Sequence, residues 1–257
     1  RFEQALTLNE TLGHRQGVAE AAAYLGRALS AQGDPQRAVS LHRRALSIKE
    51  RIGDLEGIVI SQNDLGSLTL HQGDYRSAAR HFARAREVNA QLGAVREDVR
   101  ALNGQASLAL ICGQLEEAGV AAGEALRLAT LHELGREQGR AYRTLGLVAH
   151  EEAQSDDGEL LLTRALTVFG RLEAAPAIAM VTLDMVELFV ERGDVTLARM
   201  ALDKLRPQLQ RLGRARLSLR AELCEGQVSA AEGARDDALA RLERTRASLE
   251  EINAPEL

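Results

Sequence analysis

Asparagine and arginine side chains at regular spacing are the residues of this sequence that could do binding chemistry. Asn63 and Asn103 lie 40 residues apart, and a carboxamide can both donate and accept hydrogen bonds, as an extended peptide backbone requires. Arg100, Arg140 and Arg143 follow near the same register, and a guanidinium pairs with a carboxylate or phosphate through two hydrogen bonds. The spacing thus favours recognition of a peptide that carries carboxylate groups.

Sequence patterns typical of catalysis are absent. There is no phosphate-binding loop, no nucleophile elbow and no HExxH pair. The six histidines are scattered, and we interpret them as surface or packing residues. Cys112 and Cys224 form no CxxC pair, and we expect both to be buried small apolar residues. The sequence therefore predicts no enzyme activity, no cofactor and no metal.

The stretch SDDGE, residues 155–159, resembles a calcium loop only superficially, because it lacks the alternating oxygen ligands and the closing glutamate. Asp156 with Glu159 instead predicts a capping box at a helix start. The Gly-Asp turn found elsewhere is replaced here by Ala153-Gln154. We therefore expect the helix that follows to begin late.

Composition limits the classes of function. The chain has 257 residues and a net charge of −5 with both signs interspersed, which argues against a nucleic-acid or anionic-membrane surface. No apolar run approaches the roughly 18 residues that span a bilayer. Two separated cysteines and the lack of an apolar leader after Arg1 make the cytoplasm the expected location.

Small residues recur every 40 positions and reveal an internal repeat. Turn glycines mark five of six slots, and Ala153 takes the other; the glycines are Gly33, Gly73, Gly113, Gly193 and Gly233. A second series marks a close helix crossing with Ala38, Ala78, Ala118, Gly158, Ala198 and Ala238. Such regularity predicts stacked copies of one structural unit.

The sequence of each unit predicts two helices, here named helix A and helix B. In the first unit, helix A is expected at about residues 19–32, with an apolar stripe that includes Leu25 and Leu29, and Gly33 ends it in the left-handed region. Asp34 then caps helix B, with Pro35 at its first position. One such pair cannot bury both of its faces, so successive pairs must stack.

This pattern resembles the tetratricopeptide repeat family along the whole chain. The family's Leu-Gly pair in helix A is matched by Leu25-Gly26, Leu65-Gly66 and Leu145-Gly146, and its helix B signature by Ala78, Phe82 and Ala85. The 40-residue unit is longer than usual, as in kinesin light chains and in bacterial regulator and signalling arrays. The resemblance implies an all-α, right-handed α-solenoid of stacked antiparallel helix pairs, with helix A residues lining a concave groove.

The expected array has about six and a half units in a single superhelix. A lone helix B at 1–17 precedes units at 18–57, 58–97, 98–137, 138–177, 178–217 and 218–257. The unpaired first helix indicates a fragment of a longer protein. Pro207 predicts a kink or break in the fifth helix B.

The predicted groove is lined by polar residues of helix A. These are Arg27, Asn63, Ser67, Arg100, Asn103, Ser107, Arg140 and Arg143. The resemblance to kinesin-light-chain-like arrays implies a backbone clamp at the asparagines. A solvated helix face also requires such residues, and that alternative stays open.

We accordingly expect a non-catalytic scaffold that binds a protein or peptide segment with acidic or C-terminal carboxylate groups. The bound segment could also belong to another domain of the same protein. Two alternatives remain: a ligand-sensing regulatory domain of a larger bacterial signalling protein, and a homodimer formed through the array ends.

Overall fold

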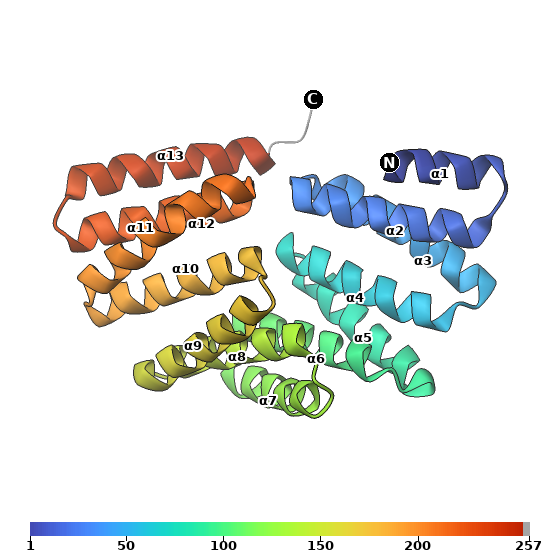
Figure 1. Ribbon diagram of the computed structural model, residues 1–257, viewed down its shortest axis with the longest axis horizontal. Coiled ribbons are helices and arrows are strands. Elements are labelled where there is room, and N and C mark those ends of the chain that lie inside the picture. Colours follow the sequence, from blue (N-terminus) through green and yellow to red (C-terminus); the bar gives the residue numbers. More distant parts are fainter. Residues whose placement is uncertain (254–257) are drawn as a thin grey trace. The chain divides into compact units, whose positions relative to one another are not determined.

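The computed structural model describes residues 1–253, which form thirteen α-helices joined by short turns (Figure 1). In chain order these are α1 (Phe2–Thr11), α2 (Arg15–Gln32), α3 (Pro35–Ile52), α4 (Leu55–His71), α5 (Tyr75–Leu92), α6 (Val95–Ile111), α7 (Leu115–Leu131), α8 (Gly135–Glu151), α9 (Ser155–Arg171), α10 (Ala175–Arg192), α11 (Val195–Leu212), α12 (Ala215–Ala231) and α13 (Arg235–Asn253). Even-numbered helices are A helices and odd-numbered helices are B helices. The predicted all-α array of antiparallel helix pairs is confirmed.

The chain divides into two compact units. The first unit, Arg1–Thr144, contains α1 to α7 and the beginning of α8, and the second, Leu145–Leu257, contains the remainder. In each unit a helix packs against its neighbours in sequence, as a repeat array requires.

The turns between helices have the predicted chemistry. Gly33 ends α2 with φ +94°, a left-handed conformation that a side chain would disfavour. The carboxylate of Asp34 then accepts a hydrogen bond from the Arg37 amide at 3.1 Å. The predicted helix stop and cap are confirmed, but α2 begins at Arg15 rather than 19, because Val18 and Ala19 are buried and extend its packed face.

The turn at Ala153 overturns the expectation of a late helix start. Ala153 adopts φ +61°, the left-handed conformation that glycine takes at the same register of the other repeats, and α9 begins at Ser155 in the usual register. The predicted capping box is also wrong. Gln154 is the N-cap residue, and Asp156 and Glu159 instead pair with Arg192.

Replacing Ala153 by glycine is expected to raise the free energy of unfolding by about 1 kcal/mol, because the left-handed conformation strains a residue with a Cβ. The matched control is Ala240→Gly, an exposed helical alanine, which should lower stability by a similar amount. Urea denaturation followed by circular dichroism measures both. Equal loss of stability in the two variants would contradict the assigned strain.

Two further expectations differ from the structure. The predicted break at Pro207 does not occur, because α11 continues from Val195 to Leu212 with the proline ring on its exposed side and with Leu205 and Leu209 buried. Cys224 is buried as predicted, but Cys112 is exposed, since it lies at the C-cap of α6 outside the packed face.

The core of each pair depends on small residues where the two helices cross. Ala38, Ala78 and Ala85 have no exposed surface. A Cβ added at Gly66 of α4 would lie 2.6 Å from the ring of Phe82 in α5, and one at Gly104 of α6 would lie 2.3 Å from that ring. The absence of side chains at the two glycines therefore provides the space in which the buried Phe82 ring packs.

Across the part of the chain that the structure describes, no helix is both long enough and apolar enough to cross a bilayer. Within the same residues no three His, Cys, Asp or Glu side chains come together in a group able to hold a metal ion.

Candidate functional site

Asp64 links three successive A helices of the first unit. Arg27 of α2 donates to its Oδ2 through Nε at 3.0 Å and Nη2 at 2.8 Å. Arg100 of α6 donates through Nη2 to Oδ1 at 2.7 Å. Because each helix comes from a different repeat, this carboxylate fixes the stacking of three repeats.

The charge of Asp64 is stabilised by its partners. Burial disfavours the carboxylate, but the charges of Arg100 and Arg27 outweigh burial and hold the pKa of Asp64 below its ordinary value. Asp64 is therefore ionised at neutral pH.

A second contact chain joins α4 to α6. The amide nitrogen of Asn63 donates to the carbonyl oxygen and to Oε2 of Glu97, both at 3.0 Å. Arg100 donates to the same Oε2 through Nη1 at 2.8 Å. Arg27, Asp64, Arg100, Glu97 and Asn63 thus form one continuous polar network.

The same arrangement recurs one repeat later. Asn103 of α6 donates to the carbonyl oxygen of Glu137 in α8 at 3.1 Å and to its Oε2 at 3.4 Å. Arg140 donates to that Oε2 at 3.4 Å. Ser67 and Ser107 donate to the carbonyl oxygens of Asn63 and Asn103, so both hydroxyls lie beside the network.

The structure brings Arg27, Asn63 and Arg100 into one network and joins Asn103 with Arg140 in a second. Arg143 lies on α8, half-buried. Asn63 and Asn103 are buried, with their NH₂ groups bonded to the next repeat and their Oδ1 atoms shielded and unbonded. The geometry gives both asparagines a contact between repeats; the predicted backbone clamp stays a prediction.

Sequence reasoning missed Glu97 and Glu137, the residues that join these networks. Their signal was a glutamate 34 residues after each asparagine in two consecutive repeats. Only the stacking of neighbouring A helices brings residues at that separation together.

His42 of α3 lies under Asp64. Its side chain is buried, and Nδ1 is 3.7 Å from Asp64 Oδ2, too long for a hydrogen bond. Burial lowers the pKa of His42; Asp64 opposes this shift, whereas Arg27 and Lys49 add to it. The imidazole is therefore neutral at pH 7.

Stability should fall as the pH decreases from 7.5 to 5.5. The unfolded chain binds a proton at His42 near pH 6.5 while the folded chain does not, so acid favours unfolding by at most about 1.4 kcal/mol per pH unit. His81 also has a pKa lowered by burial and contributes in the same direction. His42→Gln should remove part of the slope, measured by urea denaturation at each pH. An unchanged slope would contradict the assignment; His132→Gln, which removes an exposed imidazole, is the control.

A related ion-pair network occurs in the second unit. Asp184 and Arg220 occupy the registers of Asp64 and Arg100, and their Oδ1 and Nη2 atoms are 2.7 Å apart. Arg220 also donates to both carboxylate oxygens of Glu187. Burial and the nearby Glu187 raise the pKa of Cys224 to about 12, so its thiol is protonated and unreactive.

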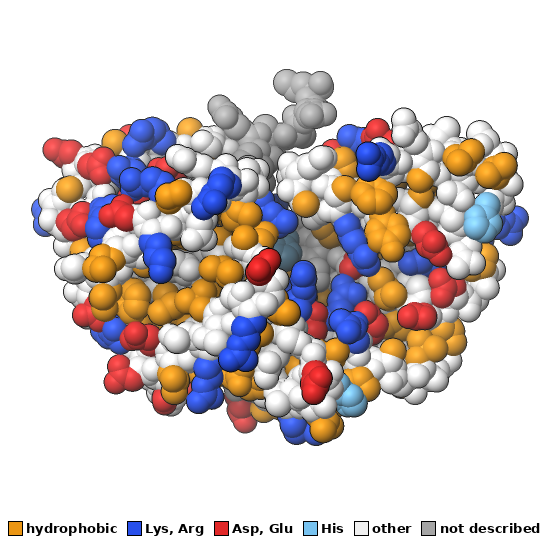
Figure 2. Space-filling model, in the orientation of Figure 1, with side chains coloured by type: hydrophobic (Ala, Val, Ile, Leu, Met, Phe, Trp, Pro, Cys, Tyr) orange, Lys and Arg blue, Asp and Glu red, His pale blue; other side chains and the backbone are white. Residues whose placement is uncertain are grey.

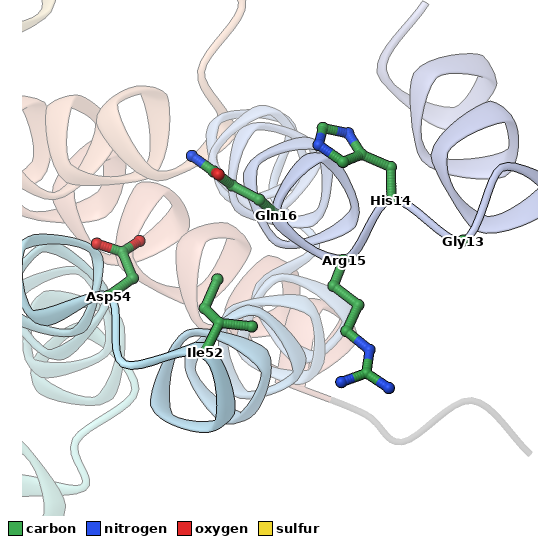
Figure 3. A pocket seen from close by; sticks show the side chains of 6 residues that line it. All are labelled: Gly13, His14, Arg15, Gln16, Ile52 and Asp54. Atoms are coloured by element: carbon green, nitrogen blue, oxygen red, sulfur yellow. The ribbon is translucent and has the colours of Figure 1, made fainter.

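An open pocket of about 600 Å³ lies at the turns that precede α2 and α4. Its lining residues are Gly13, His14, Arg15, Gln16, Ile52 and Asp54. Figure 3 shows their side chains spread around the opening rather than directed to one point. The pocket offers no convergent set of ligand contacts.

The face shown in Figure 2 carries charges of both signs. Over the first unit, Lys and Arg side chains and Asp and Glu side chains lie scattered among hydrophobic ones. This mixture agrees with the ion pairs between successive A helices.

Comparison with known families identifies the repeat. The profile of the tetratricopeptide repeat family matches residues 18–52, which include most of α2 and all of α3. The other helix pairs follow it at the 40-residue period, and the chain is a tetratricopeptide repeat array. The matching profile describes a helical repeat rather than a catalytic domain. Comparison with curated proteins finds no match.

Three solved structures illustrate the shared fold. The Rap conjugation gene regulator of plasmid pLS20, in complex with the Phr* peptide, is 13% identical with a TM-score of 0.81, over 95% of this chain and 66% of that one. A Rap protein complexed with competence and sporulation factor is 12% identical with a TM-score of 0.73, over 93% and 68% of the chains. BtubC (BKLC) from P. vanneervenii is 20% identical with a TM-score of 0.57, over 96% and 94%. At these identities the similarity shows the fold.

Proposed function

We propose that the A-helix face of the first unit binds an extended peptide segment of a protein partner, without catalysis. This face is formed by α2, α4, α6 and the part of α8 before Thr144. Contacts between successive A helices hold it in one arrangement, so a ligand would find its contacts already positioned.

The observation that carries the proposal is that the acidic side chains of this face are largely buried whereas two of its arginine side chains are exposed. The side chains of Asp64, Glu97 and Glu137 are 10%, 10% and 6% exposed. Those of Arg27 and Arg140 are 45% and 47% exposed. The carboxylates are used inside the array while the guanidinium groups reach solvent, so the face favours a partner with acidic side chains or a C-terminal carboxylate.

The solved relatives support this use of the fold. The pLS20 regulator was solved in complex with the Phr* peptide, and its TM-score is the highest of the three structures described above. In our proposal Asn63 and Asn103 set the spacing of the A helices, and Arg27, Arg140 and Arg143 meet the ligand together with Ser67 and Ser107. Arg100 belongs to the same face, with most of its hydrogen-bonding capacity used by Asp64 and Glu97.

A displayed library of random decapeptides with free C-termini tests the proposal. The unaltered chain should enrich acidic peptides, and the variant Arg27→Glu, Arg140→Glu should bind them at least about tenfold more weakly, with a smaller salt dependence. The control variant Arg43→Glu, Arg76→Glu carries the same charge change on exposed B-helix positions and should bind within about twofold of the parent. Lack of enrichment, or equal loss in both variants, would overturn the proposal.

The alternative is that this face senses a ligand for a larger signalling protein. The similarity to the pLS20 regulator bound to the Phr* peptide favours it, and about a third of that regulator lies outside the matched region. Hydrogen exchange separates the two functions. A scaffold should gain protection only on the A helices that contact the peptide, whereas a sensor should also change protection on B helices.

A further inference from the structure

The polar networks around Arg100 and Arg140, in two neighbouring repeats of the first unit, are similar but differ at one position. Arg100 and Arg140 are one period apart, as are Glu97 and Glu137. The residue one period after Asp64 is Gly104, which has no carboxylate. The second network therefore has the arginine and the glutamate but lacks the aspartate.

The consequence is visible in the partners of the two arginines. Arg100 binds two carboxylates, Asp64 at 2.7 Å and Glu97 at 2.8 Å, and its side chain is 20% exposed. Among the side chains that the structure describes, Arg140 pairs with one carboxylate, Glu137, at 3.4 Å. Arg140 thus has the hydrogen-bonding capacity for a second carboxylate that Arg100 already uses.

The chain cannot supply this carboxylate from position 104. Phe82 occupies the register of His42, and a Cβ at Gly104 would lie 2.3 Å from its ring. The Phe82 ring is buried and lies close to the backbone of Gly66 as well as that of Gly104. Gly104 itself is partly exposed, so its backbone forms part of the accessible face between α4 and α8.

We propose that Arg140 binds a carboxylate of the ligand, which replaces the aspartate that pairs with Arg100 in the preceding repeat. The inference rests on the proposed peptide-binding function and names the ligand group and its principal contact. The carboxylate is an Asp or Glu side chain or the C-terminus of the peptide. Arg100 is not this contact, because Asp64 and Glu97 already bind it.

A double-mutant cycle tests the contact directly. Peptides enriched by the library are synthesised with each Asp or Glu replaced by its amide, or with a C-terminal carboxamide. One of these changes should weaken binding to the parent about tenfold. In Arg140→Gln the same change should alter the dissociation constant by less than about twofold, because the contact is already lost. Arg76→Gln, on exposed α5, should behave as the parent.

The outcomes separate the two proposals. If peptides bind but each carboxylate contributes equally with and without Arg140, the inference is overturned and peptide binding by this face stands. If the library yields no peptide, the proposed function fails together with the inference. The identity of the sensitive change, in a side chain or at the carboxamide, distinguishes an acidic residue from a C-terminus.

An internal competitor gives a second, independent test. Phe82→His combined with Gly104→Asp copies the residues of the preceding repeat, and the new carboxylate should occupy Arg140 and weaken peptide binding about tenfold. Phe82→His combined with Gly104→Asn has nearly the same shape without the charge and should retain most of the affinity. Circular dichroism confirms that both variants remain folded. Equal binding by the two folded variants would overturn the inference.

Discussion

Replacing Phe82 by alanine is expected to lower the free energy of unfolding by about 3–5 kcal/mol, the typical cost of removing a buried phenylalanine ring. The ring is 1% exposed and lies between Gly66 of α4 and Gly104 of α6. Glycines have no side chain that could rotate into the space left by the ring. The cavity should therefore remain open, which places the cost in the upper half of this range.

A second substitution tests this packing through a change of sign. Gly104→Ala should destabilise the parent, because its Cβ would meet the Phe82 ring. In the Phe82→Ala variant the same change should stabilise, since the methyl group then partly fills the cavity. Gly123→Ala on α7, where a Cβ would meet nothing within 4 Å, should stabilise the parent by about 0.5–1 kcal/mol. Urea denaturation measures all four variants. Stabilisation of the parent by Gly104→Ala would contradict the close packing of the Phe82 ring against Gly104.

The parts of the fold that were predictable from the sequence are those set by local chemistry. Helix ends depend on a few consecutive residues, and Gly33 and Asp34 act as their types indicate. The failure at Ala153 has the same basis. Sequence reasoning took glycine as required for the turn, but the surrounding helices hold alanine in the left-handed region, at a local cost.

The candidate site was predictable only in its register. The 40-residue spacing placed Asn63 and Asn103 at the same register of successive A helices, and each is buried and contacts the glutamate of the next A helix. Their partners depend on how neighbouring repeats stack. A separation of 34 to 36 residues, as between Asp64 and Arg100, becomes a contact only once the crossing of the helices is known. Sequence alone therefore could not separate a paired arginine from an exposed one.

Arg100 and Arg140 differ in whether the array uses them for its own stability. In the first network the array uses its own carboxylate, Asp64, for stability. In the second, glycine at the same register accommodates the Phe82 ring, so apolar packing supplies the stability instead. One repeat is thereby stabilised without using the full capacity of its arginine.

Replacing Asp64 by asparagine should lower the free energy of unfolding by about 2 kcal/mol. Breaking a fully buried ion pair costs about 3–5 kcal/mol, but Arg27 can still reach water and Arg100 keeps Glu97, which reduces the loss. Asp98→Asn is the control, because its pair with Arg86 is more exposed and should contribute less than about 1 kcal/mol. Urea denaturation at pH 7 measures the free energy of unfolding of both variants. Equal losses would show that the ion pairs of Asp64 stabilise the fold no more than an exposed pair does.

The pH dependence of the stability difference between the parent and Asp64→Asn tests whether the ionised carboxylate of Asp64 is its cause. Because the pKa of Asp64 is lowered in the folded state, its contribution is complete above the ordinary value of 3.8 and is lost as the pH falls through its lower folded value. The gap between the parent and Asp64→Asn should therefore not narrow from pH 7 to 5 and should close only in stronger acid. The loss assigned to His42 occurs at higher pH, where Asp64 stays ionised. Because Asp64 opposes the lowering of the pKa of His42, this loss should be at least as large in Asp64→Asn as in the parent. A gap that narrows between pH 7 and 5 would contradict the lowered pKa of Asp64.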